Sequence, residues 1–250
     1  MISKEELERL YWEEGLTQRE IAEKLGCSQY KVRMWMKRYE ISRRKRTVKY
    51  PRVELTMKQR EILYGLILSD GYLDRRRRNA FFGIKSIHLE FIQYLRNRFP
   101  DTLFPPKWLQ RIEKDGHIDY YLHTIRHPLF TELHSLFYVN SEKTIPEIEL
   151  TPTILLYWFL GDGHRHKSKN DIFITSGFTY EEYRPVIDWL ASEGIEAHWH
   201  RKSDNKRRKR SKGKGYLKIY GKDNIRRFYE LIGPPPVKCF AYKWEGGEER

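Results

Sequence analysis

Two apolar stretches of this chain end in the same dipeptide: LYGLILSDG at residues 63–71 and LYWFLGDG at residues 156–163. Each is long enough for a helix, and Asp-Gly then supplies a short carboxylate followed by the residue that best tolerates a left-handed turn. If the two helices pack together, Asp70 and Asp162 meet at one end of their interface. Two adjacent carboxylates repel each other, so this arrangement predicts a divalent cation or a shared proton.

Asp-Gly is also a common turn signal, and one copy alone would favour that simpler interpretation. The two copies, however, lie in a longer repeat with an offset of 92 positions, from Asp70 to Asp162. Each is followed by a basic loop, a strand, an amphipathic helix, further strands and another helix. We therefore expect two related halves, at residues 56–149 and 150–250, arranged about a pseudo-twofold axis.

The composition favours a polyanionic partner. Lys and Arg number 48 against 34 Asp and Glu, which gives a formal net charge of +14 at pH 7. Hydrophobic residues make up 39% of the chain, enough for a packed core, so the chain is not a disordered basic tail. Because no long apolar span or basic amphipathic helix is visible, we expect nucleic acid rather than a membrane.

The cysteines and the N-terminal sequence indicate the compartment. Cys27 and Cys239 are too few and too far apart in sequence to suggest a disulfide framework or a zinc site. The chain opens with MISKEE, which reads as the start of a charged helix rather than a signal peptide. These features predict an intracellular, cytoplasmic protein of a prokaryote.

Residues 1–46 are predicted to form a small helical DNA-binding domain. Capping-box patterns at Ser3 and Thr17, and a further cap at Ser28, mark the starts of three short helices. The stretch GLTQREIAEKLGCSQYKVRMWMKRY resembles a helix-turn-helix, whose second helix lies in the major groove of DNA. A generic three-helix bundle for protein contacts is the alternative, but the following run of basic residues favours DNA. The predicted contacts are Gln29, Tyr30, Lys31, Arg33, Arg43, Arg44, Lys45 and Arg46. Residues 47–55 then read as a basic linker.

Three further stretches show which known family the repeat resembles. HPLFTELHSLFYVNSEKTIP at residues 127–146 leads into LTPTILLYWFLGDG at residues 150–163, and IYGKDNIRRFYELIGPPPVKCFAYKW at residues 219–244 closes the second half. With these motifs, the chain from residue 56 onward resembles a single-chain, two-motif LAGLIDADG homing endonuclease of the intron-encoded kind. The resemblance implies an α+β fold of two αββαββα halves that form a DNA-binding saddle, with the motif helices at its centre.

The resemblance also implies the site residues. Asp70 and Asp162 would be the metal-binding carboxylates, with Ser69 and Gly161 beside them as further metal ligands, and Mg²⁺ would be the cofactor, for which Mn²⁺ may substitute. By position, Lys143 and Lys243 match the catalytic lysines of the two halves. Lys238 competes with Lys243 for the second of these places. The second motif departs from the pattern in having Tyr157 where the family has glycine.

Several basic side chains are expected to contact DNA in the larger domain. In the stretch from Tyr216 to Tyr220, alternation puts Leu217 and Ile219 on one face of a strand and Lys218 on the other. Runs of adjacent cations in predicted hairpin loops would add salt-dependent affinity for phosphates. The predicted contacts are Arg75, Arg76, Arg77, Arg78, Lys85, Arg201, Arg207, Arg208, Lys209, Arg210 and Lys218.

The resulting prediction is a monomeric, site-specific endonuclease that makes a metal-dependent break in double-stranded DNA and leaves short 3′ overhangs. Two alternatives use the same scaffold: a catalytically silent DNA-binding regulator and an RNA-splicing maturase. The presence of a carboxylate in both motifs favours the nuclease.

Overall fold

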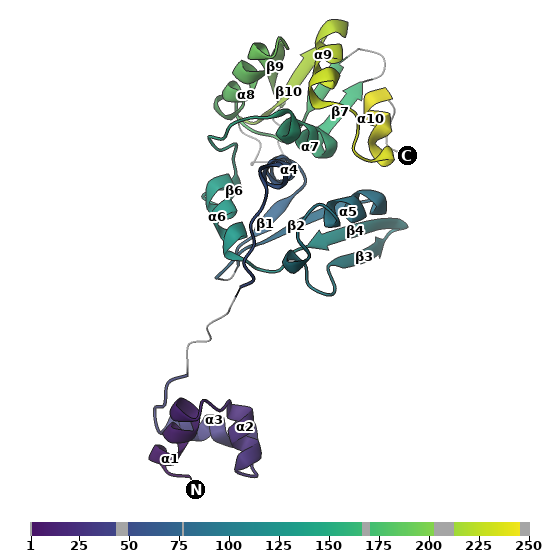
Figure 1. Cartoon of the computed structure of the whole chain (residues 1–250). Coiled ribbons are helices and arrows are strands. Elements are labelled where there is room, and N and C mark those ends of the chain that lie inside the picture. The colour runs from purple at the N-terminus through teal and green to yellow at the C-terminus, as the bar shows by residue number, and fades with distance from the viewer. Residues whose placement is uncertain (1, 44–49, 77, 167–170, 203–212, 246–250) are drawn as a thin grey trace. The chain divides into compact units, whose positions relative to one another are not determined.

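The computed structural model describes residues 2–43, 50–76, 78–166, 171–202 and 213–245 (Figure 1). Contacts within the chain divide it into a smaller unit, Met1–Lys49, and a larger unit, Tyr50–Arg250. None of the described helices is both long and apolar enough to cross a membrane.

The smaller unit is helical, and its helices begin where the capping residues predict. Ser3 and Ser28 each accept a hydrogen bond from a backbone N–H in the first turn of the following helix, and Thr17 forms a complete capping box with Glu20. The turn before the last helix contains Gly26, whose φ of 61° is the left-handed conformation that glycine adopts at low cost. The elements are α1 (Lys4–Glu8), which continues into the π-helical turn η1 (Arg9–Glu13), α2 (Gln18–Lys24) and α3 (Gln29–Arg38).

The larger unit contains two copies of one αββαββα pattern. The first copy comprises α4 (Met57–Leu68), β1 (Tyr72–Asp74), β2 (Phe81–Ser86), α5 (Leu89–Arg96), η2 (Asp101–Leu103), β3 (Leu109–Lys114), β4 (His117–His123) and α6 (Pro128–Phe137), followed by the small hairpin β5 (Tyr138–Val139) and β6 (Glu142–Lys143). The second comprises α7 (Pro152–Asp162), β7 (Gly163–His166), β8 (Asp171–Ile174), α8 (Tyr180–Ser192), β9 (Ala197–Arg201), β10 (Gly215–Tyr220) and α9 (Lys222–Ile232), followed by η4 (Lys238–Phe240) and α10 (Ala241–Glu245).

The two sheets repeat the same topology. Their strand orders are β1-β2-β4-β3 and β7-β8-β10-β9, and every pairing is antiparallel. The expected alternation on β10 is present, because Leu217 and Ile219 are fully buried while Lys218 is not. The predicted fold class is therefore confirmed: two equivalent α+β halves joined at their first helices.

The motif helices α4 and α7 lie side by side between the two sheets (Figure 1). Thr56 and Thr151 cap their first turns, as the sequence predicts. Apolar residues occupy most sides of both helices because each faces the other helix and its own sheet, and one continuous hydrophobic core spans both halves.

Two glycines let the motif helices approach closely. A Cβ atom on Gly65 would overlap the backbone carbonyl of Ile154 and the Cβ of Tyr157. A Cβ on Gly161 would lie 2.5 Å from both the Cβ and the Oγ of Ser69. Tyr157 thus stands at the interface without separating the helices, since the room for it comes from Gly65 on the opposite helix. Its hydroxyl lies 2.7 Å from that of Tyr94 on α5.

The larger unit begins before the predicted end of the linker. The Tyr50 ring packs edge-on against His127, and the Nε2 atom of His127 lies 2.9 Å from the carbonyl oxygen of Pro51. Leu55 is buried in the main core. Residues 50–55 therefore pack on the larger unit, and the linker predicted over residues 47–55 is shorter at this end; residues 44–49, with Arg44, Lys45 and Arg46, lie outside the described residues.

We expect the substitution Gly65→Ala to destabilise the larger unit. The atoms that the new methyl group meets belong largely to the α7 backbone, which cannot move aside cheaply, so the cost should be about 1–3 kcal/mol of unfolding free energy. Urea unfolding measures this. Met57→Ala, at a 74% exposed position of the same helix, is the matched control and should change stability little. Equal stability of Gly65→Ala and the wild type would contradict the close contact of the helices.

Candidate active site

The two motif carboxylates lie at the same end of the α4–α7 pair. Asp162 is the last residue of α7, and Asp70 follows Ser69, the residue that ends α4. The Oδ2 atom of Asp70 would be 3.1 Å from a Cβ on Gly161, so this carboxylate lies beside the residue that precedes Asp162. The structure thus brings together the two acids that are 92 positions apart in the sequence.

The environments of the two acids differ. Asp70 is exposed, whereas Asp162 is only partly accessible. Burial raises the pKa of the Asp162 carboxyl, and a hydrogen bond with Ser176 and the nearby ammonium groups of Lys143, Lys243 and Lys202 oppose that rise. The cations around Asp162 therefore favour its ionised form despite its burial.

Each predicted lysine binds the carbonyl groups at the end of a motif helix. In the first half, Lys143 Nζ on β6 donates to the carbonyl oxygens of Ser69 at 2.6 Å and Gly71 at 2.8 Å. In the second half, Lys243 Nζ on α10 donates to those of Gly161 at 3.2 Å and Gly163 at 2.7 Å. The acceptors are equivalent positions of the repeat, and a cation at a helix C-terminus also complements the helix dipole.

These contacts distinguish between the two lysines that the sequence left in competition. Lys243 is 6% exposed and also donates to the carbonyl of Leu160, at 2.7 Å. Lys238 lies on the surface at the start of η4 and is exposed. The internal repeat therefore favours Lys243 as the counterpart of Lys143.

Two cavities flank the end of the helix pair, and each combines residues of both halves. One, the Asp70 pocket, is lined by Asp70, Ser69, Lys85 and Asp119 of the first half and by Lys243 and Gly161 of the second. The other, the Asp162 pocket, is lined by Asp162, Ser176 and Lys214 of the second half and by Lys143 and Glu142 of the first. Each pocket thus contains the acid of one half and the lysine of the other.

Lys143 has an unusual protonation equilibrium. Burial lowers its pKa to about 8, although the carboxylates of Asp162 and Asp70 favour the charged form. An amine with that pKa exchanges a proton readily at near-neutral pH. Residues 60–219, which include both motif aspartates and Lys143, fit the model of the LAGLIDADG DNA endonuclease family. The chain belongs to this family.

Individual relatives agree with the assignment. A probable intron-encoded endonuclease 1 of Wickerhamomyces canadensis is 30% identical over 200 residues, which cover 74% of this chain and 83% of that protein. The uncharacterized protein MJ1098 of Methanocaldococcus jannaschii is 26% identical over 254 residues, which cover 94% of this chain and 96% of its own length. Because the larger unit has 201 residues, a match over 94% of the chain extends into the smaller unit.

The fold is shared with a solved structure, that of the homing endonuclease I-WcaI bound to its DNA recognition sequence. The TM-score is 0.64 at 22% identity, and the match covers 77% of this chain and 88% of that one. A LAGLIDADG fold for the larger unit is thus established by sequence and by structure.

The oxygen atoms of this LAGLIDADG site suit a hard divalent cation. The protein would supply only a few of the ligands of that cation. Within the described residues, no group of three or more His, Cys, Asp and Glu side chains is placed to hold a metal. Mg²⁺ commonly takes one or two carboxylates and completes its shell with water and substrate phosphates, so Asp70 and Asp162 fit that use. The carbonyl oxygens of Ser69 and Gly161, the residues for which the resemblance implies a ligand role, each accept a lysine hydrogen bond.

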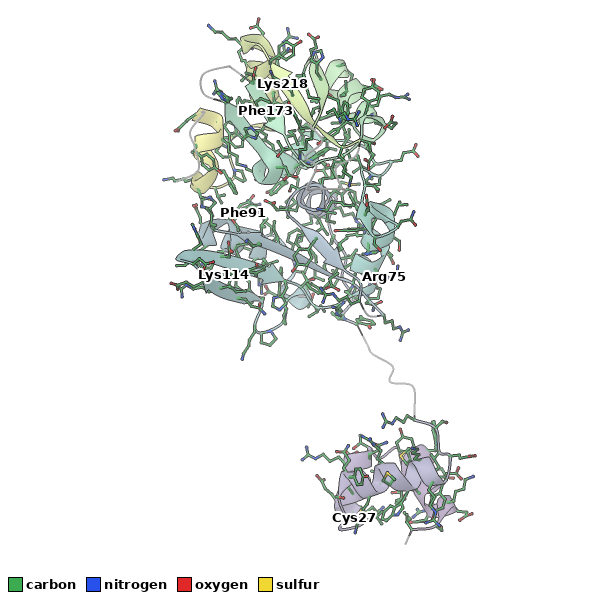
Figure 2. The ribbon with its side chains drawn as sticks, turned by 180° about the vertical axis from the view of Figure 1, so that it is seen from behind. Cys27, Arg75, Phe91, Lys114, Phe173 and Lys218 are labelled. Atoms are coloured by element: carbon green, nitrogen blue, oxygen red, sulfur yellow. The ribbon has the colours of Figure 1, made fainter. Side chains whose placement is uncertain are left out.

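The predicted DNA-contacting lysines on the sheets carry ion pairs. Lys85 Nζ lies 2.7 Å from Asp119, and Lys218 Nζ lies 2.9 Å from Asp171. Lys218 also lies over the ring of Phe173, on the adjacent strand of the same sheet (Figure 2). Cross-strand partners depend on register, and sequence patterning does not identify them.

The remaining predicted contacts are placed in part. Arg75, Arg76 and Arg78 are exposed in the loop between β1 and β2, and Arg201 is exposed at the end of β9. Arg77 and the run Arg207, Arg208, Lys209 and Arg210 lie outside the described residues.

The sequence did not identify several side chains around the acids, among them Ser176, Lys202 and Asp119. Ser176 had a usable signal, since it follows β8 just as Ser86 ends β2 in the other half. The histidines of the second sheet stack on aromatic rings: His164 on Phe173 and His200 on Tyr216. This stacking favours a role for these histidines on the surface of the sheet over a role in metal binding.

We expect Lys243→Met to destabilise the protein, because several carbonyl groups at the end of α7 lose their shared donor while staying buried. The cost should be about 1–3 kcal/mol of unfolding free energy, measured by urea unfolding. Lys238→Met, at an exposed position, is the control and should unfold like the wild type. A larger effect at Lys238 than at Lys243 would reverse the assignment of the second lysine.

Proposed function

We propose that the protein is a site-specific DNA endonuclease that makes a double-strand break and leaves short 3′ overhangs. The observation that carries this proposal is the repetition of a complete acid–lysine set. Asp70 with Lys243 and Asp162 with Lys143 line two separate pockets at the end of one helix pair. Because one chain supplies both sets, a monomer could cut both strands.

Binding of DNA would start from charge. The protein carries a net charge of +14, and exposed arginines lie in the β1–β2 loop of the first sheet. Such cations supply salt-dependent affinity for phosphates. On the sheets, Lys85 and Lys218 would exchange their carboxylate partners for phosphates or base edges.

In the reaction, Asp70 and Asp162 would hold the cofactor Mg²⁺, or Mn²⁺ in its place. When bound, the ion would stabilise charge on the phosphate group and lower the pKa of a coordinated water. Lys143 Nζ, with its pKa of about 8, could take up or release a proton beside the scissile phosphate at the Asp162 pocket. At the Asp70 pocket, Lys243 Nζ is buried against four carbonyl oxygens and would serve as a fixed positive charge.

The test is a selection followed by cleavage. The protein captures fragments of a randomised duplex library in Ca²⁺, and after Mg²⁺ is added the new ends are sequenced. Paired cuts with a fixed stagger at one motif are the expected result. Enrichment of a motif without new ends would make the protein a DNA-binding regulator, and capture of intron RNA without capture of DNA would make it a maturase.

On the selected site, we expect Asp70→Asn or Asp162→Asn to abolish the double-strand break, with a loss of about 100-fold or more in rate, because each removes one carboxylate of the ion site. Affinity for the site in Ca²⁺ should persist, as measured by fluorescence anisotropy. Asp115→Asn, in the exposed turn between β3 and β4, is the matched control and should cut normally. If both motif variants still made double-strand breaks, the assignment would be wrong.

A further inference from the structure

The helix α3 of the smaller unit has a solvent-exposed face made of cations and large apolar side chains. Val32 and Met36 face the small core and are buried, so the opposite side of the helix is its outward face. Counting by helical turns, that face is centred on Tyr30, Met34 and Lys37, with Arg33 beside them. Tyr30 is 65% and Met34 44% exposed, and both are large apolar side chains that a purely solvated helix would not need.

Charge in the smaller unit is segregated by helix. α3 contains four cations (Lys31, Arg33, Lys37 and Arg38) and not one acidic residue. The segment of α1 and η1, by contrast, carries four glutamates against two cations. The outward side chains of α3 also line one concavity, together with Met36, Gln18 of α2 and Arg43. A face that is cationic, concave and partly apolar is complementary to a duplex, whose phosphates flank grooves with base edges and thymine methyl groups.

A hydrophobic core and a defined turn hold the outward face of α3 in place within the smaller unit. Its own hydrophobic core, which includes Leu7, Leu10, Ile21, Val32 and Met36, is separate from that of the larger unit. The turn between α2 and α3 is fixed by Gly26 and by a hydrogen bond from Cys27 N–H to the Ala22 carbonyl oxygen at 2.9 Å. Two helices joined by a short glycine-containing turn are a common way to present the second helix to a major groove.

We propose that α3 reads one major groove of DNA outside the segment that the larger unit occupies, with Tyr30, Arg33, Met34 and Lys37 as the groove-facing set. The inference rests on the proposed function only in that the larger unit sits on DNA. It also moves the centre of the reading face one turn further along the helix than Gln29 and Lys31, which lie at its edges.

Chain connectivity limits where this groove can be. Arg43 and Tyr50 are seven residues apart, a path of at most about 25 Å, or about seven base pairs of duplex. Tyr50 and Pro51 are held against His127, at the start of α6 in the first half. Because each chain has one α3 and a short connection, the additional bases are expected on one flank of the central site only.

The experiment applies the randomised duplex selection, in Ca²⁺, to the full chain and to two variants. Arg33→Ala removes a groove-facing cation, and Arg19→Ala, on α2, removes another exposed arginine that lies outside the face. The wild type should enrich a central block of bases and a separate block of about 3–5 base pairs on one flank. Arg33→Ala should lose the flanking block while keeping the central one, with roughly tenfold weaker binding to the full site. Arg19→Ala should keep both blocks.

The outcomes separate this proposal from the proposed function. A central block that is cut in Mg²⁺, with no flanking block in the wild type, would overturn the role of α3 and leave the nuclease standing. A flanking block unchanged in Arg33→Ala, or flanking blocks on both sides, would overturn the role of α3 as well. A flanking block that depends on Arg33, without any cutting in Mg²⁺, would support α3 and overturn the nuclease. Failure to enrich any motif would overturn both.

Discussion

The close contact between α4 and α7 determines the rest of the larger unit. It places the ends of two helices, and with them Asp70 and Asp162, at one point, and it joins two sheets into one core. Close approach requires a residue without a side chain at each crossing point, which Gly65 and Gly161 provide. The carbonyl groups left unpaired at the helix ends are then bound by Lys143 and Lys243, so the same contact that packs the core also creates the positions of the cations.

The two halves have the same topology but not the same chemistry. Asp70 is exposed and Asp162 is not, and burial lowers the pKa of Lys143, in the Asp162 pocket, to about 8. The neighbours differ too: the Asp70 pocket contains the Lys85–Asp119 pair, and the Asp162 pocket contains the Lys214–Glu142 pair. A repeat that has diverged in this way need not treat the two strands of its substrate equally, even though the backbone geometry of the halves is matched.

Much of this architecture could be predicted from the sequence because it depends on local rules. Capping residues gave the starts of α2, α3, α4 and α7, and period-two alternation gave the faces of β10. The pairing of Asp70 with Asp162 followed from a repeat, which is visible without a structure. Contacts between segments far apart in sequence were not predictable in this way. The Lys85–Asp119 and Lys218–Asp171 pairs depend on strand register, and the packing of Tyr50 on His127 depends on how the chain enters the core.

The two pockets, each formed by residues of both halves, bear on how such a two-repeat protein can arise. Since each cavity combines the acid of one half with the lysine of the other, neither half alone forms a complete pocket. A single repeat would complete such a pocket only by self-association through the same glycine contact. Joining two copies in one polypeptide made that association intramolecular, so it no longer depended on protein concentration. Each half can then have a different surface, so a duplex bound by the two halves need not be a palindrome.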